Sequence, residues 1–284
     1  MENKGSQQTW LSNIHAKLAA NLSLIIYAIL IIVPMTMVFI TSFKNTAQLY
    51  ANPMGMPESW ALDNYIKLFQ SENMFIYFKN SIFVTAVCVI SILLLSSMIS
   101  YAIIRMPKWW GNIIFGLFSL GMMIPTQVNM IPQYLLLDKL YLIDTHLGLI
   151  IVTIATQLPI GVFILTGFMK TIPKGLIEAA SMDGANHWTI YSRVMIPLSL
   201  PSMATLAIFS LMIVWNDLLF PLLLLKTKSL QTLPLALLNF QGEYLTNYPL
   251  IFSGVVVATL PMIIAYVFLQ RYFIAGMTAG SIKG

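Results

Sequence analysis

Charged side chains are scarce in this chain of 284 residues. Only 9% of the residues are charged, whereas a typical soluble domain carries about 25%. Hydrophobic residues make up 58% and form long runs without a charge. This composition excludes a soluble globular protein. It predicts one integral membrane domain over residues 1–284, because no polar segment is long enough for a second domain.

Cysteine is almost absent. Cys88 is the only one, so the chain has neither a disulfide framework nor a cysteine cluster for a metal. The three histidines, His15, His146 and His187, lie in separate segments, which argues against a metal centre of the HExxH type. The net charge of +5 includes no basic run and sits at the ends of the apolar segments, which argues against a nucleic-acid partner.

Motifs for nucleotide chemistry and hydrolysis are also missing. No glycine is followed by lysine, so the phosphate-binding loop G-x-x-x-x-G-K-[ST] is absent, and no G-x-S-x-G elbow occurs. The chain is therefore predicted not to be an enzyme and to bind no cofactor. If its function uses ATP, the nucleotide and its magnesium ion belong to another polypeptide.

Long uncharged runs are what the sequence has instead. At a rise of 1.5 Å per residue, about 20 apolar residues cross the hydrocarbon core of a bilayer. Six runs reach this length and predict an all-α integral membrane protein with six transmembrane helices, at about 18–43, 80–104, 109–137, 145–169, 198–225 and 247–270.

The distribution of Lys and Arg predicts the orientation. Six spans place both termini on the same side of the membrane. The N-terminus, the tail and the loops at 105–108 and 170–193 together hold nine Lys and Arg, whereas the other three loops hold six. Positively charged loops stay in the cytoplasm, so both termini and the loop between the fourth and fifth spans are predicted to be cytoplasmic.

The loop between the fourth and fifth spans is rich in turn-forming residues. Pro173 suits the first turn of a helix, and Gly184 suits the left-handed position that ends one. Asn186 is expected to cap a second helix, which Pro197 and Pro201 close. One face of this second helix would carry Trp188, Tyr191, Val194 and Met195. Each helix of about ten residues reaches only about 15 Å, half the bilayer core, so the pair is predicted to lie outside the membrane, where a partner can bind it.

A polar cluster inside the fifth predicted span consists of Trp215, Asn216 and Asp217. A charge at membrane depth costs about 2.5–3.5 kcal/mol on insertion scales, so Asp217 should face the bundle interior or water. One interpretation places the cluster beside a translocation path, where the indole would stack on a sugar ring. The other is a polar turn that breaks the helix before Pro221 near the outer interface. The residues alone favour neither.

Amide side chains occur near prolines in the third and fourth predicted spans: Gln127, Asn129, Gln133 and Gln157. Amides can hydrogen-bond a hydroxyl-rich solute without the desolvation cost of a charge, which makes them candidates for the substrate path. They can equally join neighbouring helices. The prolines Pro125, Pro132 and Pro159 free backbone groups nearby, and such breaks are tolerated only against protein or a wet cavity.

The loop between the fourth and fifth spans also carries a known motif. It contains Glu178-Ala179-Ala180, then Asp183-Gly184-Ala185, then Ile196-Pro197, and it resembles the EAA loop of importer-type ABC transporter permeases. Ile196 stands where the family most often has leucine, and Val194 stands for isoleucine. The resemblance implies that residues 173–201 form a coupling helix-turn-helix that docks into a cleft of an ATP-hydrolysing subunit. It assigns this coupling role to Glu178, Ala179, Ala180, Asp183, Gly184, Ala185 and Pro197.

The C-terminal segment, residues 270–284, carries a second resemblance. It reads QRYFIAGMTAGSIKG and is similar to the ending of permeases in oligosaccharide-type carbohydrate importers, notably the shorter permease of the maltose-type importers. W-N-D followed by an apolar run and proline recurs in the same permeases. The resemblance implies that the tail contacts the ATPase subunits through Thr278, Ala279, Gly280 and Lys283.

Together these resemblances cover nearly the whole chain. They imply a permease subunit of a binding-protein-dependent ABC importer that forms half of the translocation path for a sugar, of the oligosaccharide class. The implied partners are a second permease subunit in a heterodimer, two ATPase subunits, an extracytoplasmic sugar-binding protein and membrane lipid. The implied location is the inner or plasma membrane of a prokaryote, as a multi-pass protein.

A secondary transporter or channel that works without an ATPase is the alternative. It would need charges at mid-membrane for ion coupling, and Asp217 alone qualifies.

Overall fold

The computed structural model describes residues 3–71, 73–238 and 247–281. Every regular element in these ranges is a helix, as the composition predicts. By its contacts the chain divides into two units. The N-terminal unit contains Met1–Glu72 and Phe240–Val257, and the main unit contains Asn73–Asn239 and Ala258–Gly284.

The helices are distributed over the two units as follows. The N-terminal unit holds α1 (Asn3–Thr41), α2 (Thr46–Ala51), α3 (Asp63–Ser71) and the start of α13 (Tyr248–Ser281). The main unit holds the rest of α13 and the helices α4 (Met74–Arg105), α5 (Lys108–Met123), η1 (Thr126–Asn129), α6 (Met130–Lys139), α7 (His146–Met169), α8 (Lys174–Met182), α9 (His187–Ile190), η2 (Tyr191–Met195), α10 (Ile196–Trp215), α11 (Leu219–Leu224), η3 (Lys228–Leu230) and α12 (Leu233–Leu238).

The number of membrane spans agrees with the prediction only under one condition. Within the described residues, five helices are long and apolar enough to cross a membrane: α1 from Lys17, α4, α7, the path from α9 through α10, and α13 to Phe268. A sixth span results if the bent pair α5–α6 counts as one.

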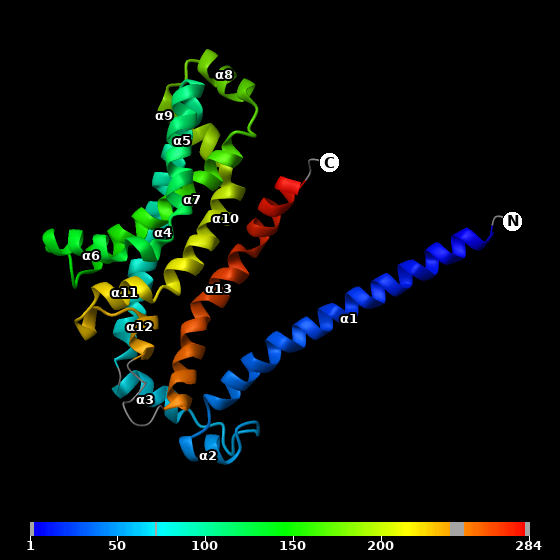
Figure 1. The fold of residues 1–284 in the computed structure, drawn as a ribbon, viewed down its shortest axis with the longest axis vertical. Helices are drawn as coiled ribbons and strands as arrows, with labels where there is room; N and C mark the ends of the chain where they lie inside the picture. The colour runs from blue at the N-terminus through cyan, green and yellow to red at the C-terminus, as the bar shows by residue number, and fades with distance from the viewer. Residues whose placement is uncertain (1–2, 72, 239–246, 282–284) are drawn as a thin grey trace. The chain divides into compact units, whose positions relative to one another are not determined.

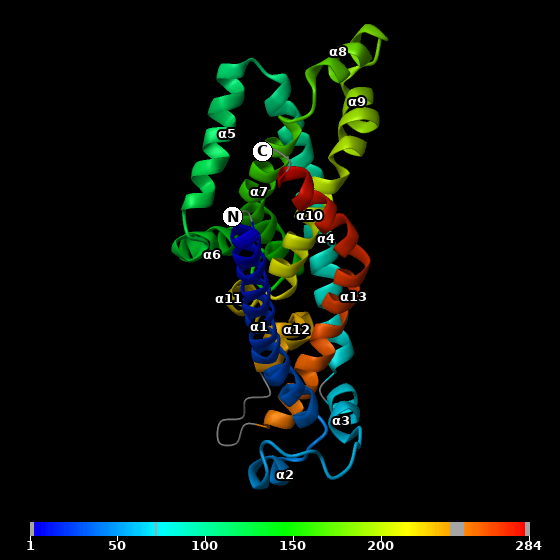
Figure 2. The same cartoon turned by 90° about the vertical axis from the view of Figure 1, so that its right-hand side faces the viewer.

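Three long helices, α4, α7 and α10, pack side by side at the centre of the main unit (Figures 1 and 2). Their shared core is apolar, and its least exposed members include Cys88, Ile92, Leu149, Leu165 and Leu206. This core fixes the relative positions of α4, α7 and α10. These helices carry the loop between the fourth and fifth predicted spans and the candidate substrate-path residues Gln157 and Trp215.

Small residues allow α4 and α7 to approach closely. A Cβ added at Gly161 would lie 2.2 Å from Ser96 Oγ, so a larger residue there would have to displace this hydroxyl. Ser100 Oγ donates to the Val162 carbonyl at 3.3 Å and accepts from Thr166 Oγ1 at 2.9 Å. Small residues and hydroxyl hydrogen bonds hold helices together in lipid, where apolar surface gains little from association.

The third predicted span, 109–137, is not one helix, and this part of the prediction is corrected. α5 and α6 are bent by 90°, which Figure 2 shows as an elbow. Ile124 has an extended backbone, with φ −87° and ψ 116°, because Pro125 disfavours the helical conformation of its predecessor. Pro132 lies in the first turn of α6, where a missing N–H loses no intrahelical bond.

The fifth span differs from the prediction at both ends. Pro197 and Pro201 do not close the second loop helix, because α9, the π-helical turn η2 and α10 follow one another without a break. Pro197 lies two residues after the π-helical turn, and Pro201 lies inside a helix that neighbouring helices support. At the other end α10 stops at Trp215, short of residue 225.

The N-terminal unit is held together by polar contacts at the end of α1. Asn64 Nδ2 donates to the carbonyls of Ser42 and Lys44, both at 2.8 Å, and the Tyr65 hydroxyl lies 2.7 Å from Ser42 Oγ. Lys44 is 1% exposed, and its Nζ donates to two backbone carbonyls at 2.9 and 3.1 Å. These bonds offset part of the cost of burying an ammonium group.

We expect Gly161→Ala to lower the thermal unfolding midpoint of the purified protein. The added methyl group overlaps Ser96, and overpacking of this kind costs about 1–3 kcal/mol. Gly167→Ala in the same helix is the matched control, because no atom lies within 4 Å of its added Cβ. Adding Ser96→Ala should restore part of the loss. An unchanged midpoint for Gly161→Ala would contradict the close contact of α4 and α7.

Candidate functional site

The loop between α7 and α10 folds as a helix-turn-helix at one end of the main unit (Figure 1). The N–H groups of Gly184 and Ala185 donate to carbonyls in the last turn of α8 at 3.1 and 3.0 Å, the pattern of a Schellman turn. Gly184 has φ +80°, the left-handed conformation predicted for it. Asn186 caps α9, also as predicted, by accepting a hydrogen bond from the Thr189 N–H at 2.8 Å.

An apolar cluster fixes this helix-turn-helix to the ends of α4 and α7. Its buried members are Tyr101, Met169, Ile177, Ile190, Tyr191 and Met195. Two hydrogen bonds reinforce the cluster: the Tyr191 hydroxyl lies 2.8 Å from Ser97 Oγ, and the Tyr101 hydroxyl donates to the His187 carbonyl at 3.2 Å. Because packed interiors resist deformation, a displacement of α8 is transmitted to the long helices.

The other side of the helix-turn-helix is open within the described residues. Glu178, Ala179, Asp183, Gly184 and Pro197 are exposed, and Ala180 and Ala185 are half-buried. Large apolar side chains accompany them, with Met182 89% and Trp188 65% exposed. The ring of Trp188 lies beside that of Tyr191, with centroids 5.4 Å apart, as expected for residues on one face. Tyr191 is buried, whereas Trp188 is exposed. The exposed surface combines acidic and apolar groups on a thin helix.

A polar cavity of about 130 Å³ lies in the main unit where two helix breaks meet. One break is the elbow at Pro125, and the other is the gap between α10 and α11. Three of the predicted path residues, Gln127, Gln157 and Asp217, line this cavity together. The other lining residues are Thr126, Met130, Thr153, Thr156, Ile213, Val214, Leu219 and Phe220. Amides, hydroxyls and a carboxylate thus border one space, and this set can hydrogen-bond a hydroxyl-rich solute.

Trp215 does not line the polar cavity. It is 5% exposed, its Nε1 donates to the Ala258 carbonyl at 3.0 Å, and its ring meets Phe78 edge-on with centroids 6.0 Å apart. It borders a separate apolar cavity of about 300 Å³ lined by residues of α4, α10 and α13. In this arrangement the indole packs between helices.

The remaining predicted site residues are dispersed. Asn216 is the C-cap residue that follows α10, and its Nδ2 donates to the Met212 carbonyl at 2.8 Å. Asn129 stands at the start of α6, and Gln133 on α6 has a buried Oε1 without a hydrogen-bond partner in the described residues. Of the tail residues, Thr278, Ala279 and Gly280 belong to the end of α13, their side chains are not among those described, and Lys283 lies outside the described residues.

Sequence reasoning missed a set of polar side chains that fasten the segment after α11. Asp144 Oδ1 accepts from the N–H groups of Lys226 and Thr227 at 2.8 and 2.9 Å, and its Oδ2 accepts from the Thr227 hydroxyl at 2.5 Å. His146 Nε2 lies 2.8 Å from the Leu230 carbonyl. The signal in the sequence is the run Asp144-Thr145-His146, which places a carboxylate, a hydroxyl and an imidazole at the start of the fourth predicted span.

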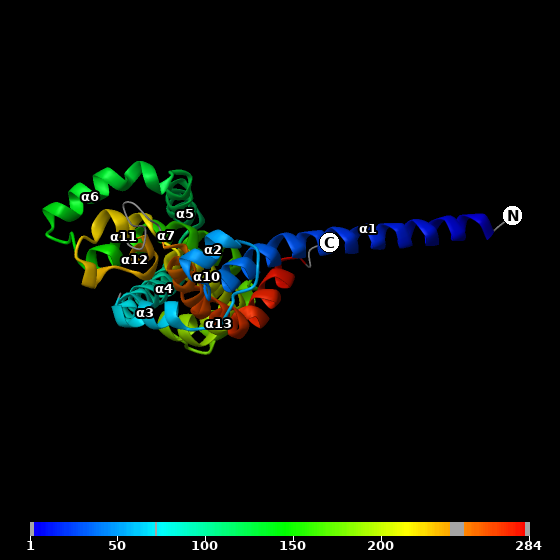
Figure 3. The ribbon, with the colours of Figure 1, turned by 90° about the horizontal axis from the view of Figure 1, so that it is seen from below.

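The same segment is also joined to α4. Asn80 Nδ2 donates to the carbonyls of Ser229 and Gln231 at 2.8 and 2.9 Å, and Ser81 Oγ accepts from the Leu233 N–H at 2.7 Å. Viewed end-on in Figure 3, α11 and α12 lie beside α7 and α4. The segment from Leu224 to Leu233 is therefore an ordered part of the main unit rather than a free loop.

Asp144 is the charged residue among those that hold the segment after α11. The Thr227 hydroxyl, then the N–H groups of Thr227 and Lys226, hold the pKa of its carboxyl below the ordinary value, because all of them stabilise the ionised form. Its φ of +58° is unusual for a residue with a side chain, although aspartate tolerates it better than most.

Comparisons with known proteins agree on one family. A family model described as "Binding-protein-dependent transport system inner membrane component" matches residues 94–279. An arabinooligosaccharides transport system permease protein of Halalkalibacterium halodurans is 34% identical over 261 residues, which cover 90% of this chain and 93% of that protein.

Two solved structures are similar in fold. A bacterial ABC transporter involved in the import of the acidic polysaccharide alginate has a chain that matches with a TM-score of 0.80 and 22% identity, covering 92% of this chain and 98% of that one. A bacterial alginate ABC transporter in complex with an alginate pentasaccharide-bound periplasmic protein matches with a TM-score of 0.70 and 16% identity, over 94% and 95% of the two chains.

We expect Asp144→Asn to loosen the segment after α11. Loss of the charged acceptor of an exposed contact costs about 1 kcal/mol, which corresponds to about fivefold faster amide hydrogen exchange at Lys226 and Thr227. Because folding lowers the pKa of Asp144, its contribution is present above the unfolded pKa of about 3.9 and is lost as the pH falls through the folded pKa. Asp138→Asn, an exposed aspartate on α6, is the matched control. Equal exchange in the two variants at neutral pH would contradict this role.

Proposed function

The chain belongs to the family of binding-protein-dependent transport system inner membrane components, and we propose that it is one of two permease subunits of an ABC importer for sugars of the oligosaccharide class. It is a transporter subunit, and in this family ATP hydrolysis resides in a separate subunit. The observation that carries the proposal is the exposed EAA helix-turn-helix anchored rigidly on α4 and α7.

Coupling to the ATPase is assigned to α8 and the turn after it. Glu178 and Asp183 offer negative charges, Met182 and Leu176 offer apolar contact, and Ala179 keeps the helix thin enough for a groove. The cluster around Tyr191 connects α8 with α4 and α7, so that movement of the ATPase pulls on the long helices together. When the two ATPase subunits close and open, the translocation path would thus open alternately to the outside and to the cytoplasm.

The orientation follows from the bias of Lys and Arg. Both termini and the helix-turn-helix are proposed to be cytoplasmic, which puts the coupling surface on the side of ATP. The segment from Leu224 to Leu233 then lies outside, at the end of the main unit opposite to α8 (Figures 1 and 2). The location proposed for the whole protein is the inner or plasma membrane of a prokaryote.

The polar cavity is proposed as part of the sugar path. Its volume of about 130 Å³ is below the about 300–1,000 Å³ of typical small-molecule sites. This size supports a path completed by a second permease subunit, and the partner proposed from the family resemblance is a different chain in a heterodimer. Gln127, Gln157 and Asp217 would hydrogen-bond the sugar hydroxyls, while Asn129, Gln133, Trp215 and Asn216 would support the surrounding helices.

Further partners follow by likeness to relatives. One similar structure is a transporter in complex with a sugar-bound periplasmic protein, which supports an extracytoplasmic sugar-binding protein for this chain as well. The tail residues Thr278, Ala279, Gly280 and Lys283 are proposed to reach the ATPase subunits, which would bind ATP and magnesium. The alternative of a secondary transporter or channel loses its support, because the family works through a binding protein and a separate ATPase.

The coupling role is tested by variants of the turn in the fully assembled transporter in proteoliposomes. Gly184→Ala strains a backbone at φ +80° by about 1–3 kcal/mol, and proline cannot adopt this conformation at all. We expect Gly184→Pro and Glu178→Lys to lower sugar uptake per ATP hydrolysed by about tenfold, with Gly184→Ala intermediate.

Gly175→Ala is the control for the glycine variants, because its added Cβ meets nothing within 4 Å. Glu178→Gln, which keeps the size of the side chain, controls for the charge reversal. Normal uptake and normal ATP hydrolysis by Gly184→Pro and Glu178→Lys would overturn the docking role of this helix.

The sugar path is tested by removing single amides. We expect Gln127→Leu and Gln157→Leu to raise the KM of uptake by about 2–13-fold, because a hydrogen bond to a neutral partner is worth about 0.5–1.5 kcal/mol. Gln133→Leu makes the same chemical change on α6 outside the cavity and should leave the KM unchanged. An equal effect of all three substitutions would show that the amides act only in helix packing.

A further inference from the structure

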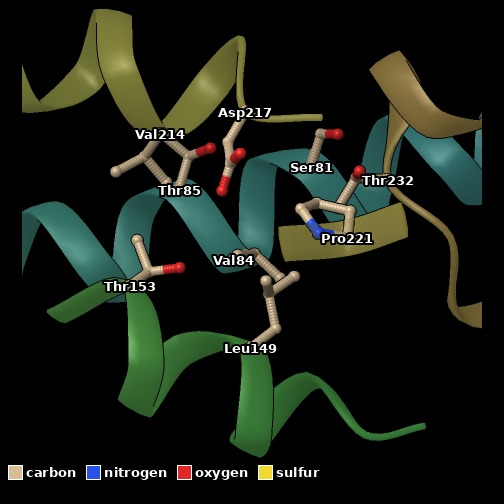
Figure 4. A pocket seen from close by; sticks show the side chains of 9 residues that line it. All are labelled: Ser81, Val84, Thr85, Leu149, Thr153, Val214, Asp217, Pro221 and Thr232. Atoms are coloured by element: carbon tan, nitrogen blue, oxygen red, sulfur yellow. The ribbon is translucent and has the colours of Figure 1, made fainter. Parts of the chain in front are cut away.

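A second, much smaller cavity lies behind the polar one. Its volume is about 10 Å³, and it is enclosed by α4, α7, the break between α10 and α11, and the segment before α12. Figure 4 shows the side chains that line it: Ser81, Val84, Thr85, Leu149, Thr153, Val214, Asp217, Pro221 and Thr232. Four of the nine carry hydroxyl groups and one carries a carboxylate. A space of this size holds one water molecule or one small ion.

At this cavity Ser81 Oγ accepts from the Leu233 N–H at 2.7 Å, which leaves it one further lone pair. Asp217 Oδ1 accepts from the N–H of Leu219 at 3.1 Å and from that of Phe220 at 3.5 Å. Thr232 is 5% exposed, and its Oγ1 is buried without a hydrogen-bond partner in the described part of the chain. An orphaned buried hydroxyl beside a cavity of this size is explained by a bound species that the protein atoms alone do not supply.

Among the residues that the structure describes, no basic side chain lines this cavity beside Asp217. The larger polar cavity that shares Asp217 has no basic lining residue in this part of the chain either. Asp217 is half-buried, so its carboxylate is partly desolvated, and a cation close to it would stabilise the ionised form. A water molecule would satisfy Thr232 but would leave this charge in place.

We propose that the small cavity binds one monovalent cation of the size of Na⁺. The carboxylate of Asp217 and the hydroxyl oxygens of Ser81, Thr85, Thr153 and Thr232 would supply its ligands, since hard cations take oxygen donors. A single carboxylate favours a monovalent ion over a divalent one. In Figure 4 the Asp217 side chain points toward α4, where Thr85 and Ser81 stand on either side of it.

The larger cavity provides the entry path. Thr153, Val214 and Asp217 line both cavities, so the carboxylate forms part of the wall between them. A cation at this place connects four separate elements, including the segment before α12 through Thr232. It therefore stabilises the outer part of the main unit whichever sugar is carried, and failure of the sugar assignment would leave the cation site untouched.

The test is the thermal unfolding midpoint of the purified, assembled transporter in NaCl, KCl or choline chloride at equal ionic strength. We expect Na⁺ to raise the midpoint by about 2–4 °C in a saturable manner, with little effect of choline. Asp217→Asn and Thr232→Val should abolish the difference between Na⁺ and choline. Thr205→Val is the matched control, because the hydroxyl of this threonine of α10 donates to the Pro201 carbonyl and the residue does not line the cavity.

A direct measurement keeps the proposal testable if a variant fails to assemble. Equilibrium dialysis of the wild-type transporter with radioactive Na⁺ should show one saturable site per chain, which unlabelled NaCl displaces and choline does not. Absence of saturable Na⁺ binding, or equal midpoints in Na⁺ and choline, would overturn the proposal and leave a bridging water in the cavity. Equal stabilisation by K⁺ would overturn the match to the size of Na⁺.

Discussion

The backbone in a membrane must satisfy its polar groups, and this constraint organises the main unit. Helices can break at membrane depth only where protein or a wet cavity replaces the lost hydrogen bonds. The chain breaks at Pro125 and again between Trp215 and Leu219, and both breaks border the same polar cavity. Residues far apart in sequence, such as Gln127 and Asp217, therefore meet there. The breaks generate a site that no single span could carry.

The two ends of the main unit are connected by rigid elements. α4 and α7 contact closely through Gly161 and Ser96, and the hydroxyls of Ser100 and Thr166 add directional bonds. The helix-turn-helix is attached to these helices at one end, and the segment after α11 is attached to them at the other through Asn80 and the start of α7. A force applied at α8 thus reaches the break beside Asp217 through packed helices, which is the physical requirement for coupled transport.

Sequence reasoning found the parts of the fold that local chemistry decides. The left-handed turn at Gly184 and the cap at Asn186 follow from backbone preferences of single residues, and both are present. Hydropathy found the apolar runs but not the bend at Pro125, because proline also occurs inside intact spans, as Pro159 does in α7. Whether a helix breaks or continues at a proline depends on what packs against it. No periodicity in the sequence contains that information.

The same limit explains the mixed outcome for the candidate path residues. Gln127, Gln157 and Gln133 are chemically identical, yet only the first two border the polar cavity. Trp215 is next to Asn216 and close to Asp217, yet its indole is bonded to α13 while the carboxylate of Asp217 lies between two cavities. Neighbouring positions in a helix point in different directions, and the end of α10 separates them further. The type of a side chain shows whether it is able to hydrogen-bond a solute. Which of these side chains border the same cavity depends on where the two helix breaks meet, and this is a property of the fold.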